Sequence, residues 1–533
     1  MSSFTNRVDT LFSQWDTTAS PGCVLAVIKD GEFIYKRGYG MADLERGMPI
    51  TAESIFDIGS TGKQFTATVI AILAKQGILA LDDPISKYLP EMPAYANKIT
   101  IRHLIHHTSG IRDYLTLMNL RGMLVENIYA EDLLLDLITR QKGLNFKPGN
   151  EYLYSNSGYF LLGAIAQRVT GKHITEIIKE HILAPLGMKH TTFNKDYRPI
   201  VKHRAMSYDL GEEDGTFINA VALSGGFGDG ALLTNIEDLL LWDCNFYNNK
   251  LNNAQADLLD QLHNTGRLNN GKPINYAFGL VVDSYNGQKI VQHGGSWAGY
   301  RTEMMRFPDQ RFTVICISNL GSVNPISLCQ QVADMYFEDI FTARKERKSL
   351  HAQTTSSPKT LSGSEMESFT GIYQGKQSTL DIFVKDDKLF FSNGARNYQI
   401  HLLGKKKFQL EQRPVFLSFL GKQNEQIAID KIVGHIIKLK RVQTKRYIPQ
   451  SLSIYTGEYY SPELDIRYTI TTQDNTLQLK RTPFDKLNPV YPFTEIAFLC
   501  DVGEMRLRYK DGMVKGFTLN AERVANIKFR KVV

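Results

Sequence analysis

The sequence carries at residues 55–65 the stretch IFDIGSTGKQF, in which a short apolar run meets Gly59 and then an apolar, helix-like segment. Within it, Ser60-Thr61-Gly62-Lys63 fits the pattern S-x-x-K. On a helix, this spacing places two side chains on one face, about 5–6 Å apart. The start of a helix also supplies positive potential and free backbone N–H groups. The stretch therefore predicts a nucleophilic serine, Ser60, with Lys63 beside it.

The chemistry of Ser60 depends on its neighbour, because a serine hydroxyl is a weak nucleophile until a base takes its proton. A lysine can be that base only if burial or a nearby cation lowers its pKa. A purely structural alternative is a helix capped by Ser60 with Lys63 in solvent. A second S-x-x-K pattern, at residues 356–359, falls in a Ser/Thr-rich stretch that cannot hold a site rigidly.

A second motif, Tyr154-Ser155-Asn156, lies in a turn-rich loop that leads into a predicted helix. A tyrosinate at Tyr154 could share a proton with Lys63, and Asn156 could orient that lysine or hold a substrate amide. The pattern Y-x-N also begins at Tyr95 and Tyr247, so the triplet alone is not specific. The structural alternative is a core tyrosine followed by a capping asparagine.

A third motif is His293-Gly294-Gly295, the one H-x-G pattern in the sequence. It follows an apolar strand, and its glycines allow the backbone to come close to a ligand. We expect the backbone N–H groups of Ser60 and Ser296 to form an oxyanion hole beside it. The structural alternative for His293 is a turn histidine with satisfied hydrogen bonds.

Composition narrows the classes of function. The 62 basic and 55 acidic residues leave a net charge of +7, which is mild for 533 residues and forms no basic stripe, so we expect no nucleic-acid partner. The five cysteines lack CxxC or Cys/His spacing, which predicts reduced thiols and no metal site, and we expect no other cofactor. No signal peptide or apolar stretch of membrane length is visible, which favours a cytoplasmic protein without a membrane span.

The first 348 residues mix helix and strand signals and predict one α/β (α+β) domain. Strands are expected at 23–28, 32–35, 278–282, 290–292, 301–307 and 312–317, and helices at 64–76, 159–169, 174–182 and 325–344, with Pro185 closing the third helix. This order inserts helices between terminal strands that could form one antiparallel sheet flanked by helices.

The second half of the chain has a different composition. Residues 349–362 are rich in Ser and Thr and predict a linker. Short alternating strands follow, and Phe369-Thr370-Gly371-Ile372-Tyr373 is echoed by Tyr455-Thr456-Gly457-Glu458-Tyr459. This internal repeat predicts two small antiparallel β-barrels, at 363–447 and 448–533, because closure of a sheet removes its exposed edges.

Taken together, the three motifs resemble those of the serine β-lactamase and penicillin-binding protein superfamily, especially its class C branch and the related esterases and D-aminopeptidases. Four further segments support the resemblance, which covers about residues 10–345: Leu104 to Ile111, Tyr154 to Gly163, Pro185 to Met188, and Gly225 to Leu239. The layout of one penicillin-binding-like domain followed by two barrels is similar to that of the D-aminopeptidases.

The resemblance implies a serine hydrolase. Ser60 would attack a carbonyl to form an acyl-enzyme, while Lys63 and Tyr154 would take and return the protons. Each backbone donor of the oxyanion hole would contribute about 3–4 kcal/mol. The site residues implied are Ser60, Lys63 and Tyr154 for catalysis, and Asn156, His293, Gly295 and Ser296 for substrate and oxyanion binding.

Two features bear on the substrate. β-Lactamases and DD-peptidases usually carry lysine where this chain has His293, whose ordinary pKa of about 6.5 leaves it mostly neutral at pH 7, so a substrate carboxylate is less necessary. In the D-aminopeptidases a loop of the last barrel narrows the active site. The matching stretch here is about residues 482–491, with Asp485 as the nearest acidic candidate for a specificity residue.

We therefore expect a hydrolase of small amides or short peptides, similar to D-aminopeptidases. One alternative is an esterase or weak β-lactamase of the class C type that uses the same residues. Another is a non-catalytic binding or scaffolding protein in which the barrels carry the binding function. The barrels could also mediate a homo-oligomer.

Overall fold

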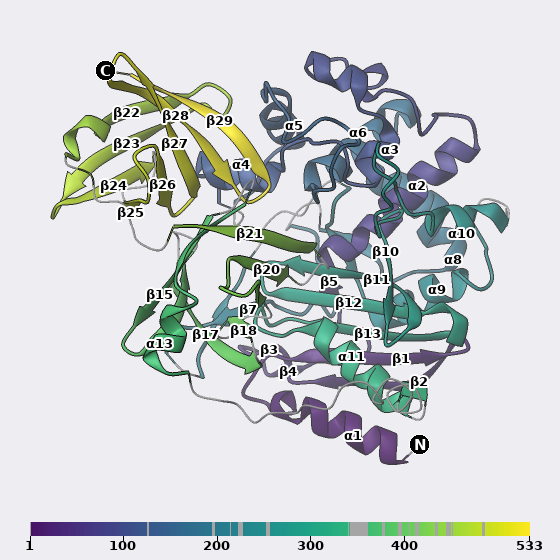
Figure 1. Ribbon diagram of the computed structural model, residues 1–533. Coiled ribbons are helices and arrows are strands. Elements are labelled where there is room, and N and C mark those ends of the chain that lie inside the picture. Colours follow the sequence, from purple (N-terminus) through teal and green to yellow (C-terminus); the bar gives the residue numbers. More distant parts are fainter. Residues whose placement is uncertain are drawn as a thin grey trace. The chain divides into compact units, whose positions relative to one another are not determined.

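The protein is described by a computed structural model (Figure 1). The described residues are 2–124, 127–194, 198–213, 215–221, 228–251, 256–338, 340–341, 361–375, 379–392, 397–404, 406–410, 415–431, 435–443, 449, 451–481 and 486–532. The chain divides into two compact units. The first comprises Met1–Gly110, Val125–Glu131 and Phe146–Gln353, and the second Ile111–Leu124, Asp132–Asn145 and Thr354–Val533.

A six-stranded antiparallel sheet forms the centre of the first unit. Its strand order is β10-β11-β12-β13-β1-β2. The strands are β1 (Cys23–Lys29), β2 (Glu32–Tyr39), β10 (Val281–Tyr285), β11 (Gln288–Trp297), β12 (Tyr300–Phe307) and β13 (Phe312–Ser318). Because β1 pairs with β13, with Leu25 opposite Cys316, the first and last parts of this region share one sheet. This confirms the predicted fold class.

The sheet is covered by helices whose apolar faces fill the core. Helices α1 (Ser2–Phe12) and α11 (Pro325–Tyr336) lie at one face, where Phe12, Val314 and Val332 belong to one fully buried cluster (Figure 1). Elsewhere in this unit, α2 (Lys63–Lys75) packs against α6 (Asn156–Thr170), and α9 (Ile236–Asn245) packs against β1. Since α2 and α6 begin at Lys63 and Asn156, their packing brings the first two motifs together.

Several predicted boundaries differ from the structure. The expected helix at 174–182 is α7 (Ile174–Ile178), a π-helical turn (Lys179–Leu183) and α8 (Ala184–Leu186). The prediction that Pro185 closes it is wrong, because Pro185 stands in the first turn of α8, where a proline is tolerated. Gly187, with φ 75°, ends the helix instead.

Three further differences concern the region from 278 to 344. Strand β10 begins at Val281 and not at 278, because Gly279 adopts φ 70°, which interrupts an extended chain. Strand β11 runs through the glycines of the third motif to Trp297, so His293 lies inside a strand and not after one. Helix α11 ends at Tyr336, short of the expected end, and residues 342–344 lie outside the described ranges.

The second unit contains two closed eight-stranded antiparallel barrels, as the internal repeat predicts. The first consists of β14 (Gly371–Gln374), β15 (Thr379–Lys385), β16 (Lys388–Ser392), β17 (Asn397–Gly404), β18 (Lys407–Leu410), β19 (Phe416–Leu420), β20 (Gln426–Lys431) and β21 (His435–Gln443). The second consists of β22 (Gly457–Ser461), β23 (Ile466–Gln473), β24 (Thr476–Arg481), β25 (Leu487–Pro492), β26 (Ala497–Cys500), β27 (Gly503–Lys510), β28 (Met513–Ala521) and β29 (Val524–Lys531).

The same hydrogen bond recurs at the start of each barrel. Tyr373 donates from its hydroxyl to the carbonyl of Phe369 (2.9 Å), and Tyr459 donates to that of Tyr455 (2.7 Å). The predicted domain boundaries at 348 and 447 lie outside the described residues and stay predictions. Within the described ranges, no helix is both long and apolar enough to cross a membrane.

Candidate active site

Ser60 and Lys63 meet at the start of α2. Ser60 lies in a 3₁₀ turn (Gly59–Gly62) between β5 (Phe56–Asp57) and the helix. The Nζ atom of Lys63 donates to Ser60 Oγ over 3.0 Å, and the lysine is fully buried while Ser60 is half-buried. The structural alternative with Lys63 in solvent is therefore wrong.

Lys63 is held from two further directions. Its Nζ donates to Asn156 Oδ1 at 2.8 Å and to the backbone carbonyl of Asp229 at 2.5 Å. These acceptors and Ser60 Oγ are all uncharged. Their arrangement aims the amine at the serine hydroxyl and fixes Asn156 at the beginning of α6.

Tyr154 lies over the same amine. The centre of its ring is 5.1 Å from Lys63 Nζ, and the ring of Tyr159 is 5.6 Å away. The imidazole of His107 packs on the Tyr154 ring with 4.2 Å between ring centres. His107 also accepts a hydrogen bond at Nδ1 from the backbone N–H of Ser155 (3.1 Å). Hence the imidazole braces the segment that carries Tyr154 and Asn156.

His293 lies in β11, is buried from solvent, and contacts the Tyr154 ring. Its Nδ1 lies 2.7 Å from the carbonyl of Gly294, which can only accept, so Nδ1 carries the proton and Nε2 accepts from the Tyr276 hydroxyl at 2.9 Å. Burial, followed by the nearby Lys63, lowers the pKa of His293 to about 3. This imidazole is therefore neutral at physiological pH and supplies no fixed positive charge.

Two glycines let β11 approach the turn that carries Ser60. A Cβ atom on Gly295 would lie 1.9 Å from the carbonyl oxygen of Ile58, and one on Gly59 (φ 50°) would lie 2.8 Å from the backbone nitrogen of Ser296. Thr61 Oγ1 fastens the two elements by donating to the carbonyl of His293 over 3.1 Å. The backbones of Ser60 and Ser296 are thereby placed beside one another.

A model of the family described as Beta-lactamase matches residues 8–326. This is more than half of the chain. The chain belongs to the Beta-lactamase family. The assignment confirms the resemblance drawn from the three motifs and supports the prediction of a serine hydrolase.

Individual members of the family are moderately similar. Penicillin-binding protein 4* of Bacillus subtilis (strain 168) is 32% identical over 317 residues, which cover 56% of this chain and 68% of that protein. A D-aminopeptidase of Brucella anthropi is 28% identical over 299 residues, which cover 56% of each chain. The match thus spans little more than half of the length of the D-aminopeptidase.

A solved structure resembles the fold over a longer stretch. The penicillin-binding protein homologue from Pyrococcus abyssi, described as octameric, has a TM-score of 0.56 and 23% sequence identity. The likeness covers 82% of this chain and all of that one, and at this identity it shows the fold alone.

Within this Beta-lactamase-family domain, the structure brings Ser60, Lys63, Tyr154, Asn156, His293, Gly295 and Ser296 to one place. The predicted specificity residue, Asp485, lies outside the described residues, as do 482–484 of its loop and Gly225-Gly226. The described part of the chain contains no group of three or more His, Cys, Asp or Glu side chains that could hold a metal ion.

Three further groups contact the predicted site residues and were not predicted from the sequence: His107, Tyr276 and the Asp229 carbonyl. His107 belongs to the segment 104–111, whose match to the family gave it no role. Tyr276 carries no motif, although Tyr276 and His293 flank a predicted strand pair. A backbone carbonyl such as that of Asp229 leaves no trace in side-chain patterns.

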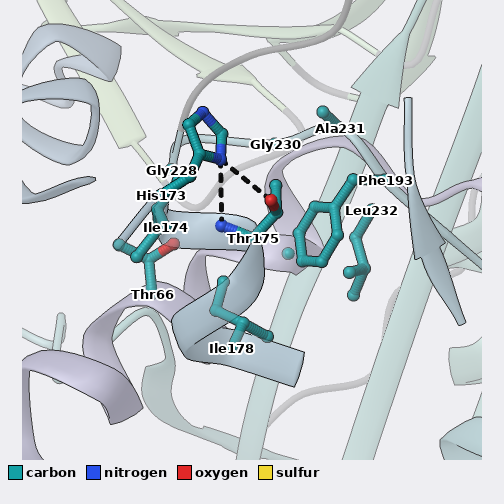
Figure 2. A pocket seen from close by; sticks show the side chains of 11 residues that line it. Thr66, His173, Ile174, Thr175, Ile178, Phe193, Gly228, Gly230, Ala231 and Leu232 are labelled. Atoms are coloured by element: carbon teal, nitrogen blue, oxygen red, sulfur yellow. Dashed lines mark hydrogen bonds between the residues drawn. The ribbon is translucent and has the colours of Figure 1, made fainter. Parts of the chain in front are cut away.

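A separate small pocket lies near the start of α2 (Figure 2). It is lined by Gly62, Thr66, His173, Ile174, Thr175, Ile178, Phe193, Gly228, Gly230, Ala231 and Leu232. Its one ionisable side chain, His173, bonds Thr175 through Nδ1 (2.8 Å) and Glu131 through Nε2 (2.7 Å). The pocket contains none of the predicted site residues, but Gly228 and Gly230 flank the residue whose carbonyl holds Lys63.

Proposed function

We propose that this chain is a serine hydrolase that forms an acyl-enzyme at Ser60 and acts on small amides or short peptides, as D-aminopeptidases do. The observation that carries the proposal is the hydrogen bond from the buried Nζ of Lys63 to Ser60 Oγ, with Asn156 and the Tyr154 ring around the same amine. With two of its hydrogens on Asn156 and Asp229, a neutral amine could accept the Ser60 proton. An ammonium that donates all three bonds would instead leave that proton to a tyrosinate at Tyr154.

In the proposed mechanism, the Ser60 oxygen attacks the substrate carbonyl as its proton passes to the Lys63–Tyr154 pair. The same pair returns a proton to the leaving amine, which departs and leaves an ester on Ser60. Water then attacks this ester, with Tyr154 as the base, and frees Ser60. The backbone N–H groups of Ser60 and Ser296 would bind the oxyanion in both steps, and the close approach of Gly59 to Ser296 supports this role.

The neutral His293 bears on the substrate class. A cation in the third motif would bind a substrate carboxylate, but burial keeps this imidazole uncharged. An amide or short peptide without a required carboxylate therefore suits the site better than a penicillin. The same neutrality suits an ester, so a class C-type esterase is the second candidate.

A substrate panel separates these candidates. We would measure release of p-nitroaniline from D- and L-amino acid p-nitroanilides, of p-nitrophenol from simple esters, and turnover of nitrocefin. The proposal expects the D-amino acid anilides to be the preferred amides. Turnover restricted to esters would favour the esterase, and turnover of nitrocefin alone would contradict the amide proposal.

Assembly is a further part of the proposal. The predicted homo-oligomer has a parallel in the Pyrococcus abyssi homologue, which is described as octameric. Light scattering on a size-exclusion column would decide it: a mass above 60.4 kDa supports an oligomer, whereas a mass of one chain rejects it.

A further inference from the structure

Two segments of the Beta-lactamase-family region belong to the second compact unit. The family match spans residues 8–326, yet Ile111–Leu124 and Asp132–Asn145 group with the residues that form the barrels. Both segments contact the second barrel, and two barrel residues, Glu463 and Arg523, each make polar contacts with both segments.

Glu463 bonds both segments at once. Its Oε1 accepts from Arg112 Nη1 at 2.7 Å and from the backbone N–H of Lys142 at 2.8 Å, and its carbonyl accepts from Gln141 Nε2 at 3.1 Å. Gln141 also accepts from Arg112 Nη1 (3.0 Å). The Arg112 and Glu463 side chains are only 3% and 5% exposed. A buried ion pair of this kind is intolerant of the loss of one partner, because the other charge is then left uncompensated.

Arg523 makes a second set of bonds to the same segments. Its Nη2 lies 3.1 Å from Oδ1 of the fully buried Asp113, and its carbonyl accepts from Asn145 Nδ2 at 2.8 Å. Asn145 Oδ1 in turn accepts from the backbone N–H of Ala525 (2.8 Å). Hence the beginning of one segment and the end of the other are both fixed to β29 and the turn that precedes it.

These segments are joined covalently to the residues around Tyr154. The chain first enters the second unit after Gly110, returns to the first at Val125–Glu131, and leaves the second again before Phe146. Gly110 and Phe146 touch within the first unit, where a Cβ on Gly110 would lie 2.2 Å from the Phe146 carbonyl. From there, Thr108 O accepts from Gly149 N (2.8 Å), and His107 O accepts from Leu153 N (3.0 Å). The next residue is Tyr154.

We propose that the second barrel positions the Tyr154 segment of the active site, and that Arg112 and Glu463 are its central positioning residues. The barrel holds the stretch between Gly110 and Phe146, which contains two helices, near both of its ends. Through these ends it would fix the two backbone hydrogen bonds that join His107–Thr108 to Gly149–Leu153, next to Tyr154. The inference rests on the proposed function, because the Tyr154 hydroxyl matters only if it moves a proton.

The test uses the full chain with Glu463→Gln, and Glu458→Gln as the matched control. Glu458 lies on β22 of the same barrel in an exposed ion pair with Arg467 (3.1 Å). Hydrogen–deuterium exchange would be followed in peptides covering residues 105–110 and 146–156, together with kcat and KM. We expect exchange to be at least about tenfold faster in both peptides for Glu463→Gln, with kcat lowered more than KM is raised. The control should match the wild type.

Unchanged exchange in residues 146–156 of a folded Glu463→Gln chain would overturn the inference, whatever its melting temperature. If Glu463→Gln does not fold, Gln141→Ala removes two of the bonds and keeps the ion pair, and its exchange must rise in the same peptides. The exchange readout needs no substrate, so an inactive wild type would reject the proposed function while leaving this test in force.

Discussion

Lys63 is the residue on which the proposed proton transfer depends. It is fully buried and donates to a hydroxyl, an amide oxygen and a backbone carbonyl, so its position is fixed by three elements of the fold. The sequence predicted the contact with Ser60 from spacing alone, and that with Asn156 from a motif whose asparagine lies 93 positions away. It could not predict the Asp229 carbonyl, since any residue type supplies one.

The first prediction concerns the proton carriers. Lys63→Ala and Tyr154→Phe should each lower kcat/KM by about 10²–10⁴-fold, because each removes a group that we propose to transfer a proton. Steady-state kinetics on the best substrate of the panel would measure this. Lys75→Ala, at the other end of the same helix, is the control and should stay near wild type. Near-normal turnover in either test variant would refute the assignment.

Glu303 is a second residue whose environment has a measurable consequence. It lies in β12 opposite Gly294 and Cys316, is 1% exposed, and has no hydrogen-bond partner for either carboxyl oxygen within the described residues. Burial raises the pKa of Glu303 from 4.5 to about 8. The folded chain therefore keeps this proton up to about pH 8, whereas the unfolded chain releases it near pH 4.5.

The second prediction follows from this difference. The free energy of unfolding should fall as pH rises from about 4.5 to 8, by up to roughly 5 kcal/mol from Glu303. In Glu303→Gln this contribution to the pH dependence should disappear, so the variant gains stability relative to wild type as pH rises. Urea denaturation at pH 5, 7 and 9 would show it. Parallel curves for the two proteins would contradict the buried, protonated state.

At the scale of elements, the approach of β11 to the Ser60 turn determines the shape of the site. The sequence predicted a strand at 290–292 and placed the third motif after it, although glycines inside a strand usually weaken it. In the structure, β12 pairs with His293, Gly294 and Gly295 in register, so tertiary pairing overrides the local preference. The glycines serve the close contact with Ile58 and Ser296 instead.

The third prediction tests this contact. Gly295→Ala should lower kcat by at least about tenfold while leaving the circular dichroism spectrum native-like, because its Cβ would meet the Ile58 carbonyl at 1.9 Å and push β11 from the turn. Gly62→Ala, whose Cβ would make an ordinary 3.4 Å contact with Leu232, is the control on the same turn. A kcat for Gly295→Ala as high as that of the Gly62→Ala control would show that the close approach of β11 to the turn is irrelevant to catalysis.

At the scale of the whole molecule, the motif order and the barrel repeat predicted the architecture: one antiparallel sheet with helices, then two closed barrels. Local sequence patterns mark the strands β1 and β2. They also mark the barrel repeat, through Tyr373 and Tyr459. Both features could therefore be predicted. The grouping of residues 111–124 and 132–145 with the barrels could not be predicted from the sequence. It depends on pairs such as Arg112 with Glu463, separated by 351 positions, and no local pattern records a partner so distant.

The fourth prediction concerns the barrels. A chain ended after residue 360 should be less stable than the full chain, because it leaves Arg112 and Asp113 without Glu463 and Arg523, and the loss of one buried partner alone costs about 3–5 kcal/mol. Thermal melting and trypsin cleavage within 111–145 would report it. A truncated chain that melts at the full-length temperature and resists trypsin would show that the barrels are dispensable to the first 345 residues.

Covalent labelling would show directly whether Ser60 is the nucleophile. A fluorophosphonate probe would be reacted with the full chain and with Ser60→Ala, and the adduct located by peptide mass spectrometry. We expect one adduct, on Ser60, and none in the variant. Labelling of the variant to the same extent, or an adduct on another residue of the wild type, would contradict this expectation.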